Sequence, residues 1–139
     1  MKVSIVIVCM NRMDNLCPCL DSIRKHTTLE YETIVVAYMF SKENLAMARE
    51  SYPWVRFIES DEISGFSENN NLALKEAKGE FCFVLNDDTE FNMDVIGKLV
   101  NDFGKLPEDT AIISPKLLNI DGSLPLCGRP PYRPIYYAL

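Results

Sequence analysis

Short apolar runs alternate along the sequence with longer segments that carry a helical pattern of apolar residues. The first run, Val3–Val8 (VSIVIV), is β-branched and almost wholly apolar, which is typical of a strand covered on both faces. We interpret Phe81–Leu85 (FCFVL) as a second buried strand. Because strands that alternate with helices pack as layers, the sequence predicts the α/β fold class.

The segment after the first run predicts a helix. Its apolar residues Leu16, Leu20 and Ile23 recur at helical spacing and so fall on one face. Asp14 or Asn15 is expected to cap this helix. Pro18 is compatible with it only in the first turn, where no backbone N–H is needed.

The other elements follow in order along the chain. Further strands are expected at Thr33–Ala37, Val55–Ile58 and Ala111–Ile113. Further helices are expected over Lys42–Tyr52, Ser67–Lys78 and Met93–Phe103. Gly79 is expected to end the third helix in a left-handed cap. Asp121-Gly122 predicts a tight turn between the extended segments Lys116–Leu118 and Ser123–Leu126.

The length and the net charge of the chain limit the classes of function that it can have. The 139 residues suffice for one domain with a buried core, and 20 acidic against 14 basic residues give a net charge of -6. This acidity argues against a nucleic-acid partner but permits a phosphorylated small molecule bridged by a metal ion. No apolar run is long enough to span a membrane, and the polar residues that directly follow the first run leave no cleavage region for a signal peptide. The expected location is therefore the cytoplasm.

The five cysteines favour a reduced protein. Cys9 and Cys82 lie inside apolar strand-like runs, where a thiol is expected to behave as a small buried hydrophobe. Cys17 and Cys19 have the spacing CxC, and no second pair follows at the spacing of a zinc site. We expect no structural zinc.

Asn86-Asp87-Asp88 directly follows the predicted strand Phe81–Leu85. In an open parallel sheet, ligands bind beyond the carboxyl ends of the strands. Two carboxylates and an amide at such an end can hold a hard divalent cation, which can in turn bridge a diphosphate. Spacing alone favours a simpler reading, a polar turn in which Asp88 caps the next element.

Two other polar clusters are expected at the same edge of the sheet. Asn11-Arg12 follows the first strand, and Gly65–Asn71 (GFSENNN) opens a helix whose free N–H groups favour anions. Taken alone, Asn11-Arg12 is compatible with an ordinary loop between a strand and a helix, and Gly65–Asn71 is compatible with a well-capped helix that has a polar face. Three clusters at one rim together favour a binding site. The sequence contains neither GxGxxG nor a P-loop, and its one histidine, His26, is expected at the far end of a helix.

Over nearly its whole length the sequence resembles the amino-terminal, donor-binding part of family-2 glycosyltransferases, closest to the rhamnosyltransferase-like subgroup. The matching segments are 3–23 (VSIVIVCMNRMDNLCPCLDSI), 52–91 (including GFSENNNLALKEAKGEFCFVLNDDT) and 112–129 (IISPKLLNIDGSLPLCGR). The resemblance implies the GT-A fold, a three-layer sandwich with a mostly parallel sheet. It also implies an inverting, metal-dependent transfer of sugar from a nucleotide-diphosphate donor to an acceptor hydroxyl in polysaccharide or glycan assembly.

The resemblance also assigns residues. Asn86-Asp87-Asp88 matches the DxD position with Asn86 in place of the first aspartate, and Asp88 falls on the ligand of Mn²⁺ or Mg²⁺. The expected contacts to the nucleotide sugar, of the UDP or dTDP type, come from the three loops at the sheet edge: Cys9, Asn11, Arg12, Gly65, Asn70, Asn86 and Asp87.

Two departures from the family pattern bear on the nucleotide. Where the family places an aspartate that contacts the base, the sequence has Ala37, followed by the apolar residues Tyr38, Met39 and Phe40. Cys9-Met10 likewise replaces the usual Thr-Tyr. Exposed side chains at 38–40 would form an apolar contact patch. This motivates the alternative hypothesis of a catalytically silent GT-A-like module for binding or assembly.

The resemblance divides the chain into two parts. Residues 1–129 correspond to a partial nucleotide-sugar-binding domain, and 130–139 (PPYRPIYYAL) to the start of a further part, so a C-terminal truncation is expected. The family's catalytic base lies beyond residue 139, and no residue is assigned that role. The acceptor is expected to be a glycan or a lipid-linked molecule, which would bring the protein to the inner face of the membrane.

Overall fold

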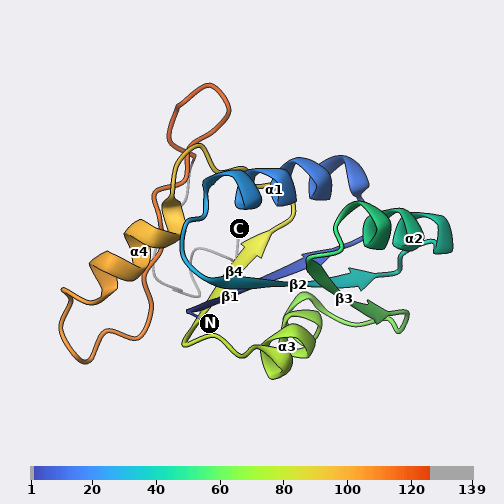
Figure 1. The fold of residues 1–139 in the computed structure, drawn as a ribbon, viewed down its shortest axis with the longest axis horizontal. Helices are drawn as coiled ribbons and strands as arrows, with labels where there is room; N and C mark the ends of the chain where they lie inside the picture. The colour runs from blue at the N-terminus through green and yellow to red at the C-terminus, as the bar shows by residue number, and fades with distance from the viewer. Residues whose placement is uncertain (1, 126–139) are drawn as a thin grey trace, which may run out of the picture.

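A computed structural model describes residues 2–125 of the chain. Four strands and four helices alternate along it (Figure 1). In chain order they are β1 (Val3–Cys9), α1 (Met13–His26), β2 (Tyr31–Tyr38), α2 (Lys42–Ser51), β3 (Val55–Ser60), α3 (Phe66–Glu76), β4 (Phe81–Asn86) and α4 (Val95–Phe103). The segment 130–139 lies outside the described residues.

The four strands form one parallel sheet in the order β3-β2-β1-β4. The central strand β1 pairs on both sides, with Val8 opposite Val36 in β2 and opposite Asn86 in β4. Because every strand runs in the same direction, all four carboxyl ends meet at one edge of the sheet. The chain segments that leave β1 and β4 are neighbours at that edge.

Helices cover both faces of the sheet. The view in Figure 1 places α1 and α2 on one side and α3 on the other. The apolar stripe of α1, Leu16, Leu20 and Ile23, is fully buried in the larger core cluster, while Ala73 of α3 packs with Val6 of β1 in a smaller one. This arrangement confirms the predicted α/β sandwich of three layers. No helix among residues 2–125 combines the length and the apolar composition needed to cross a membrane.

The start of α1 differs from the prediction. The helix begins at Met13 with Arg12 as its N-cap residue, and no side chain caps it. The expectation that Asp14 or Asn15 caps the helix is therefore wrong, because the Asp14 carboxylate pairs with Arg12 instead. Pro18 lies inside the helix rather than in its first turn. Its ring is exposed, so water can reach the carbonyl that loses its helical donor.

Strand β4 is buried on one face only. Leu85 is buried, whereas Cys82 and Val84 on the opposite face are exposed. The prediction that Cys82 is buried is therefore wrong. The cause is the position of α3, which packs against β1, β2 and β3 and leaves this face of β4 uncovered among the described residues.

The region after α4 contains less regular structure than predicted. Ala111–Ile113 is not a strand, and the segments around Asp121-Gly122 are also irregular as far as residue 125. The turn itself is confirmed: Gly122 has a φ of 80° and its N–H donates to the Asn119 carbonyl at 2.9 Å. Pro115 supplies no N–H for a strand ladder, which disfavours pairing of the chain around it.

A buried serine fastens the amino-terminal edge of the sheet. The Ser4 hydroxyl donates to Glu32 Oε1 at 2.6 Å and accepts the N–H groups of Lys78 and Gly79 at 3.1 and 2.7 Å. These bonds hold the turn between α3 and β4 against β1. Gly79 is not a left-handed cap, contrary to the prediction, because its φ is not positive. Position 79 has no room for a side chain, because the backbone of the turn lies directly against the backbone of β1.

We expect Gly79→Ala to destabilise the fold. An added Cβ would lie 2.6 Å from the carbonyl carbon of Val3, closer still to the Ser4 nitrogen, and 2.9 Å from the Phe81 oxygen. These are backbone atoms that cannot turn aside, so the free energy of unfolding should fall by about 1–3 kcal/mol. Chemical denaturation measures it. Gly104→Ala, whose Cβ would meet nothing closer than 3.7 Å, is the control, and equal stability of the two variants would contradict the account.

Candidate functional site

The loops that follow β1 and β4 lie next to each other at the carboxyl edge of the sheet. Cys9 ends β1 and is fully buried; its thiol donates to the Arg12 carbonyl at 3.5 Å and lies near the carboxylate of Asp87. The positive charge of Arg12 also acts on Asp87. The structure thus brings together three of the predicted site residues, one thiol, one guanidinium and one carboxylate.

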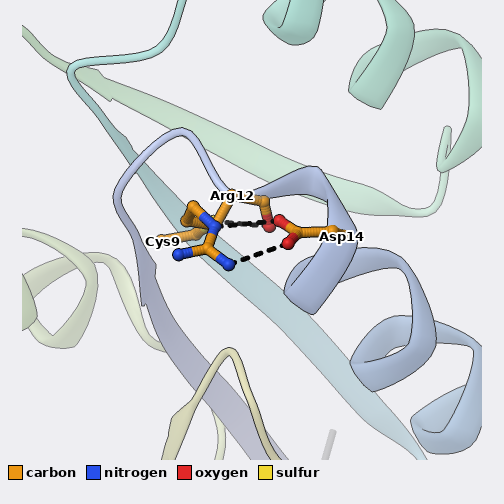
Figure 2. A network of polar contacts seen from close by, with 3 residues as sticks. All are labelled: Cys9, Arg12 and Asp14. Carbon is orange, nitrogen blue, oxygen red and sulfur yellow. Dashed lines mark hydrogen bonds and ion pairs between the residues drawn. The ribbon is translucent and has the colours of Figure 1, made fainter.

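Arg12 is held by an ion pair with Asp14 in the first turn of α1 (Figure 2). Its Nε and Nη2 donate to the two carboxylate oxygens of Asp14 at 2.9 and 2.8 Å. This hydrogen bond lowers the pKa of Asp14 below its ordinary value. Both side chains are exposed, so the pair adds little stability. Its effect is to orient a planar cation, the group best shaped to bind phosphate oxygens, at the rim of the sheet.

Asn11 ties the first loop to the next strand and helix. It adopts the left-handed conformation, with a φ of 54°, which asparagine tolerates better than most residues. Its Oδ1 accepts hydrogen bonds from the backbone N–H of Ser41 at 3.0 Å and from Asn44 Nδ2 at 2.9 Å. Ser41 is itself the N-cap of α2. Asn11 therefore joins the loops after β1 and β2.

Asp88 is the exposed carboxylate of the site. No hydrogen bond or ion pair engages it among residues 2–125. The alternative that Asp88 caps the following helix is wrong, because the N-cap of α4 is Asp94, whose Oδ1 accepts the Gly97 N–H at 2.9 Å. Asn86, also exposed, ends β4 beside it. The carboxylate of Asp88 is thus free to meet a ligand.

The described residues do not contain three or more His, Cys, Asp or Glu side chains gathered closely enough to hold a metal ion. A cation here would take only part of its ligand set from the protein. Mg²⁺ and similar hard cations commonly bind in this way, through one or two carboxylates together with phosphate oxygens of a substrate. A free carboxylate at Asp88, with Asp87 next to it, fits such a cation.

Gly65 and Asn70 lie at the start of α3, beyond the end of β3. The Gly65 N–H donates to Glu68 Oε2 at 2.7 Å, which closes the first turn of the helix. Asn70 is 6% exposed; its Nδ2 donates to the Phe66 carbonyl at 2.9 Å, and its Oδ1 is buried with no partner in the described structure. No hydrogen bond or ion pair of residues 2–125 links Gly65 or Asn70 to the loops after β1 and β4.

The apolar segment after β2 forms a smaller patch than expected. Met39 is 44% exposed and adopts a φ of 53°, whereas Tyr38 is half-buried and Phe40 packs against the core. The prediction of three exposed apolar side chains is therefore wrong for two of them. Ala37 is buried at the end of β2, opposite Cys9 in β1.

A cavity of about 450 Å³ lies elsewhere, on the flank of the sheet. It is bounded by β4, by α4 and by residues 111–113, and its walls are mainly apolar. None of the predicted site residues lines it. The polar edge formed by the loops after β1 and β4 is therefore the candidate site.

Sequence reasoning missed the residues that support these loops. Asp14 was expected to cap α1, yet it orients Arg12. Cys19 and Ser22, both on α1, contact the loop after β4: the Cys19 thiol donates to the Asn86 carbonyl at 3.8 Å, and Ser22 Oγ accepts the Phe91 N–H at 3.0 Å. These contacts join residues almost seventy positions apart, so no local pattern indicates them.

Burial keeps the two thiols of the site protonated. Desolvation, together with the nearby charge of Asp87, raises the pKa of Cys19 to about 12. Desolvation and the neighbouring carboxylate of Asp87 likewise hold the pKa of Cys9 well above its ordinary value. At neutral pH both thiols act as hydrogen-bond donors rather than as nucleophiles.

The sequence was compared with known families and proteins. The profile described as Glycosyl transferase family 2 matches residues 4–123. An uncharacterised glycosyltransferase of Bacillus subtilis, YwdF, is 38% identical over 93 residues, which are 66% of this chain and 34% of that protein. The teichoic acid poly(glycerol phosphate) polymerase of Staphylococcus epidermidis is 30% identical over 93 residues, 64% of this chain and 13% of the polymerase.

Solved structures share the fold. The fragment 1-349 of S. aureus TarS in complex with UDP superposes with a TM-score of 0.67 at 23% identity, over 76% of this chain and 32% of the fragment. The mannosyltransferase PcManGT of Pyrobaculum calidifontis, in complex with GDP-Man and Mn²⁺, gives 0.58 at 20% identity, over 67% of this chain and 29% of PcManGT. The chain spans about a third of the length of the TarS fragment, of PcManGT and of YwdF, and 20% of the longer TarS chain.

We expect alkylation at pH 8 to distinguish the cysteines of the site from that of β4. Cys82 is exposed and should react with iodoacetamide in the folded chain. Cys9 and Cys19 should react only after denaturation, because they are buried and protonated. Peptide mapping by mass spectrometry measures the extent at each position. Labelling of Cys19 as fast as Cys82 in the native protein would show that the loop does not cover it.

Proposed function

Because the chain belongs to glycosyl transferase family 2, we propose that it binds a nucleotide-diphosphate sugar at the carboxyl edge of its sheet and takes part in sugar transfer to an acceptor hydroxyl. One observation carries the proposal. Asp88, an exposed carboxylate without a partner in the described structure, stands at the end of β4 beside the loop that holds Arg12. Such an edge is where open α/β sheets bind ligands.

The charges of the edge suit a diphosphate bridged by a cation. We propose that Asp88, with Asp87 next to it, holds Mn²⁺ or Mg²⁺ together with the phosphate oxygens. The cation would neutralise the charge that develops on the departing diphosphate. The complex of PcManGT with GDP-Man and Mn²⁺ supports this choice of cation.

The residues of the chain bind and orient the donor. The guanidinium of Arg12 can present two parallel N–H groups to phosphate oxygens, and to do so it exchanges its contact with Asp14 for the ligand. The thiol of Cys9 donates to the Arg12 carbonyl at 3.5 Å and so holds the loop that carries Arg12 against the end of β1. Asn86, which pairs with Val8 of β1, lies where the loops after β1 and β4 begin.

The nucleoside is expected on the α3 side of the edge. The buried Oδ1 of Asn70 lacks a donor in the described structure, and a hydroxyl of the ribose or an N–H of the base would supply one. Gly65, the N-cap residue of that helix, has no side chain that would obstruct a ligand there. The UDP and UDP-GlcNAc complexes of TarS support a uridine nucleotide, whereas PcManGT binds GDP-Man.

The course of the reaction is part of the proposal. We propose displacement with inversion at the sugar carbon and a glycan or lipid-linked acceptor, as the resemblance implies. The similarity to a teichoic acid polymerase supports an acceptor in cell-surface polymer assembly. None of residues 2–125 is assigned as the catalytic base. The rhamnosyltransferase-like subgroup, the dTDP type of donor and the site at the inner face of the membrane stay predictions.

Calorimetric titration tests the proposed donor site. We expect UDP to bind the 139-residue chain only when Mn²⁺ is present, and dTDP to bind more weakly. Asp88→Ala should lower the affinity for UDP with Mn²⁺ by at least about tenfold, because it removes a direct ligand of the cation. Asp109→Ala, which removes an equally exposed aspartate far along the chain, should leave the affinity within about twofold.

A folded chain that binds neither nucleotide at saturating Mn²⁺ would overturn the proposed function. That outcome would favour the silent binding module. Equal losses in Asp88→Ala and Asp109→Ala would instead show that general acidity, rather than a cation site at the end of β4, governs the binding.

A further inference from the structure

Hydrogen bonds to one turn of α1 hold both ends of the acidic loop after β4. At its start, the thiol of Cys19 donates to the Asn86 carbonyl at 3.8 Å. At its end, the N–H of Phe91 donates to Ser22 Oγ at 3.0 Å. Cys19 and Ser22 are three positions apart on the helix and so lie on one face. The loop between these two anchors contains Asp87 and Asp88.

The anchor at Ser22 lies inside the core. Ser22 is 8% exposed and Phe91 is 7% exposed. The hydroxyl proton of Ser22 is used within the helix, where it donates to the Cys19 carbonyl at 2.8 Å, so its oxygen is free to accept from Phe91. The ring of Phe91 packs edge-on against Phe83 of β4 at 6.0 Å between centroids. One serine thereby connects α1, the loop and the strand.

The anchor at Cys19 holds the start of the loop. Cys19 is fully buried, and its thiol donates to the carbonyl of Asn86, the last residue of β4. By contrast, Asp88 has no partner in the described structure that would fix it. The direction of its carboxylate therefore depends on the backbone, and the backbone is fixed by Cys19 and Ser22.

A serine in a helix often bonds back to its own backbone without any further role. Ser22 differs because it also accepts the N–H of Phe91, a donor that is buried. Removing the hydroxyl would leave that N–H without an acceptor in the core, a state that folded proteins avoid. The loop would then be expected to move toward water at the Phe91 end.

We propose that Ser22 is a positioning residue of the candidate site, which together with Cys19 fixes the loop of residues 87–90 so that Asp88 faces the edge of the sheet. This inference rests on the proposed function for its ligand, a divalent cation with a nucleoside diphosphate. It assigns Ser22 no contact with that ligand.

The chain provides a matched control in Ser4. Ser4 is also a buried serine that accepts backbone N–H groups and ties a turn to β1, but it does so at the opposite edge of the sheet. Ser4→Ala and Ser22→Ala therefore remove comparable buried hydrogen bonds. Only Ser22→Ala is expected to act on the loop that carries Asp88.

The experiment uses two readouts on the whole chain. Amide hydrogen exchange should become at least about tenfold faster at residues 87–91 in Ser22→Ala and unchanged there in Ser4→Ala, which should instead loosen residues 78–79. The affinity for UDP with Mn²⁺ should fall about tenfold in Ser22→Ala and less than twofold in Ser4→Ala. Ser22→Thr, which keeps the hydroxyl, should restore the affinity to within about threefold.

The outcomes separate the two proposals. Equal losses of affinity in Ser22→Ala and Ser4→Ala, or unchanged exchange at residues 87–91, would overturn the positioning role. If the unsubstituted chain binds no nucleotide, the proposed function has failed, and the exchange data still decide whether Ser22 orders the loop. If Ser22→Ala does not fold, Cys19→Ala takes its place, with at least about threefold faster exchange expected at residues 87–89 and no change there contradicting the proposal.

Discussion

Parallel pairing of β1 with β2 on one side and with β4 on the other is the constraint on which the rest of the structure depends. It places Val8 opposite both Val36 and Asn86, so the segments that leave three strands emerge at one edge. Since β1 is almost wholly buried, helices must cover both of its faces, and each crossover returns the chain to the opposite edge. The site at the carboxyl edge follows from this topology.

Helix α1 carries two kinds of interaction at once. Its apolar stripe packs on the sheet, and the same buried side holds Cys19 and Ser22, which bind backbone groups of the loop after β4. Asn11 does the same for the loop after β2. The loops of the site are thus fixed by buried and partly buried hydrogen bonds, while the charged groups Arg12 and Asp88 stay exposed for a ligand.

The fold class, the order of the elements as far as α4 and the position of the polar edge were predictable from the sequence, whereas the strand expected at Ala111–Ile113 was not found. They depend on local signals: β-branched runs, helical spacing and the polar residues that directly follow a strand. The burial of β4 was not predictable, because the exposure of Cys82 depends on where α3 packs. The pairing of Arg12 with Asp14 and the inward packing of Phe40 also depend on neighbours that spacing does not specify. For the same reason, no local pattern in the sequence indicates that Ser22 supports the site.

The central claim is that the loops after β1 and β4 form one site for a cation and a nucleotide. Paramagnetic broadening of amide resonances by Mn²⁺ in the presence of UDP tests it most directly, because it locates the ion without any substitution. The account predicts broadening centred on residues 9–12 and 86–89, with residues 78–79 at the opposite edge unaffected. Broadening confined to other acidic surfaces, such as those around Asp102 and Asp109, would contradict it.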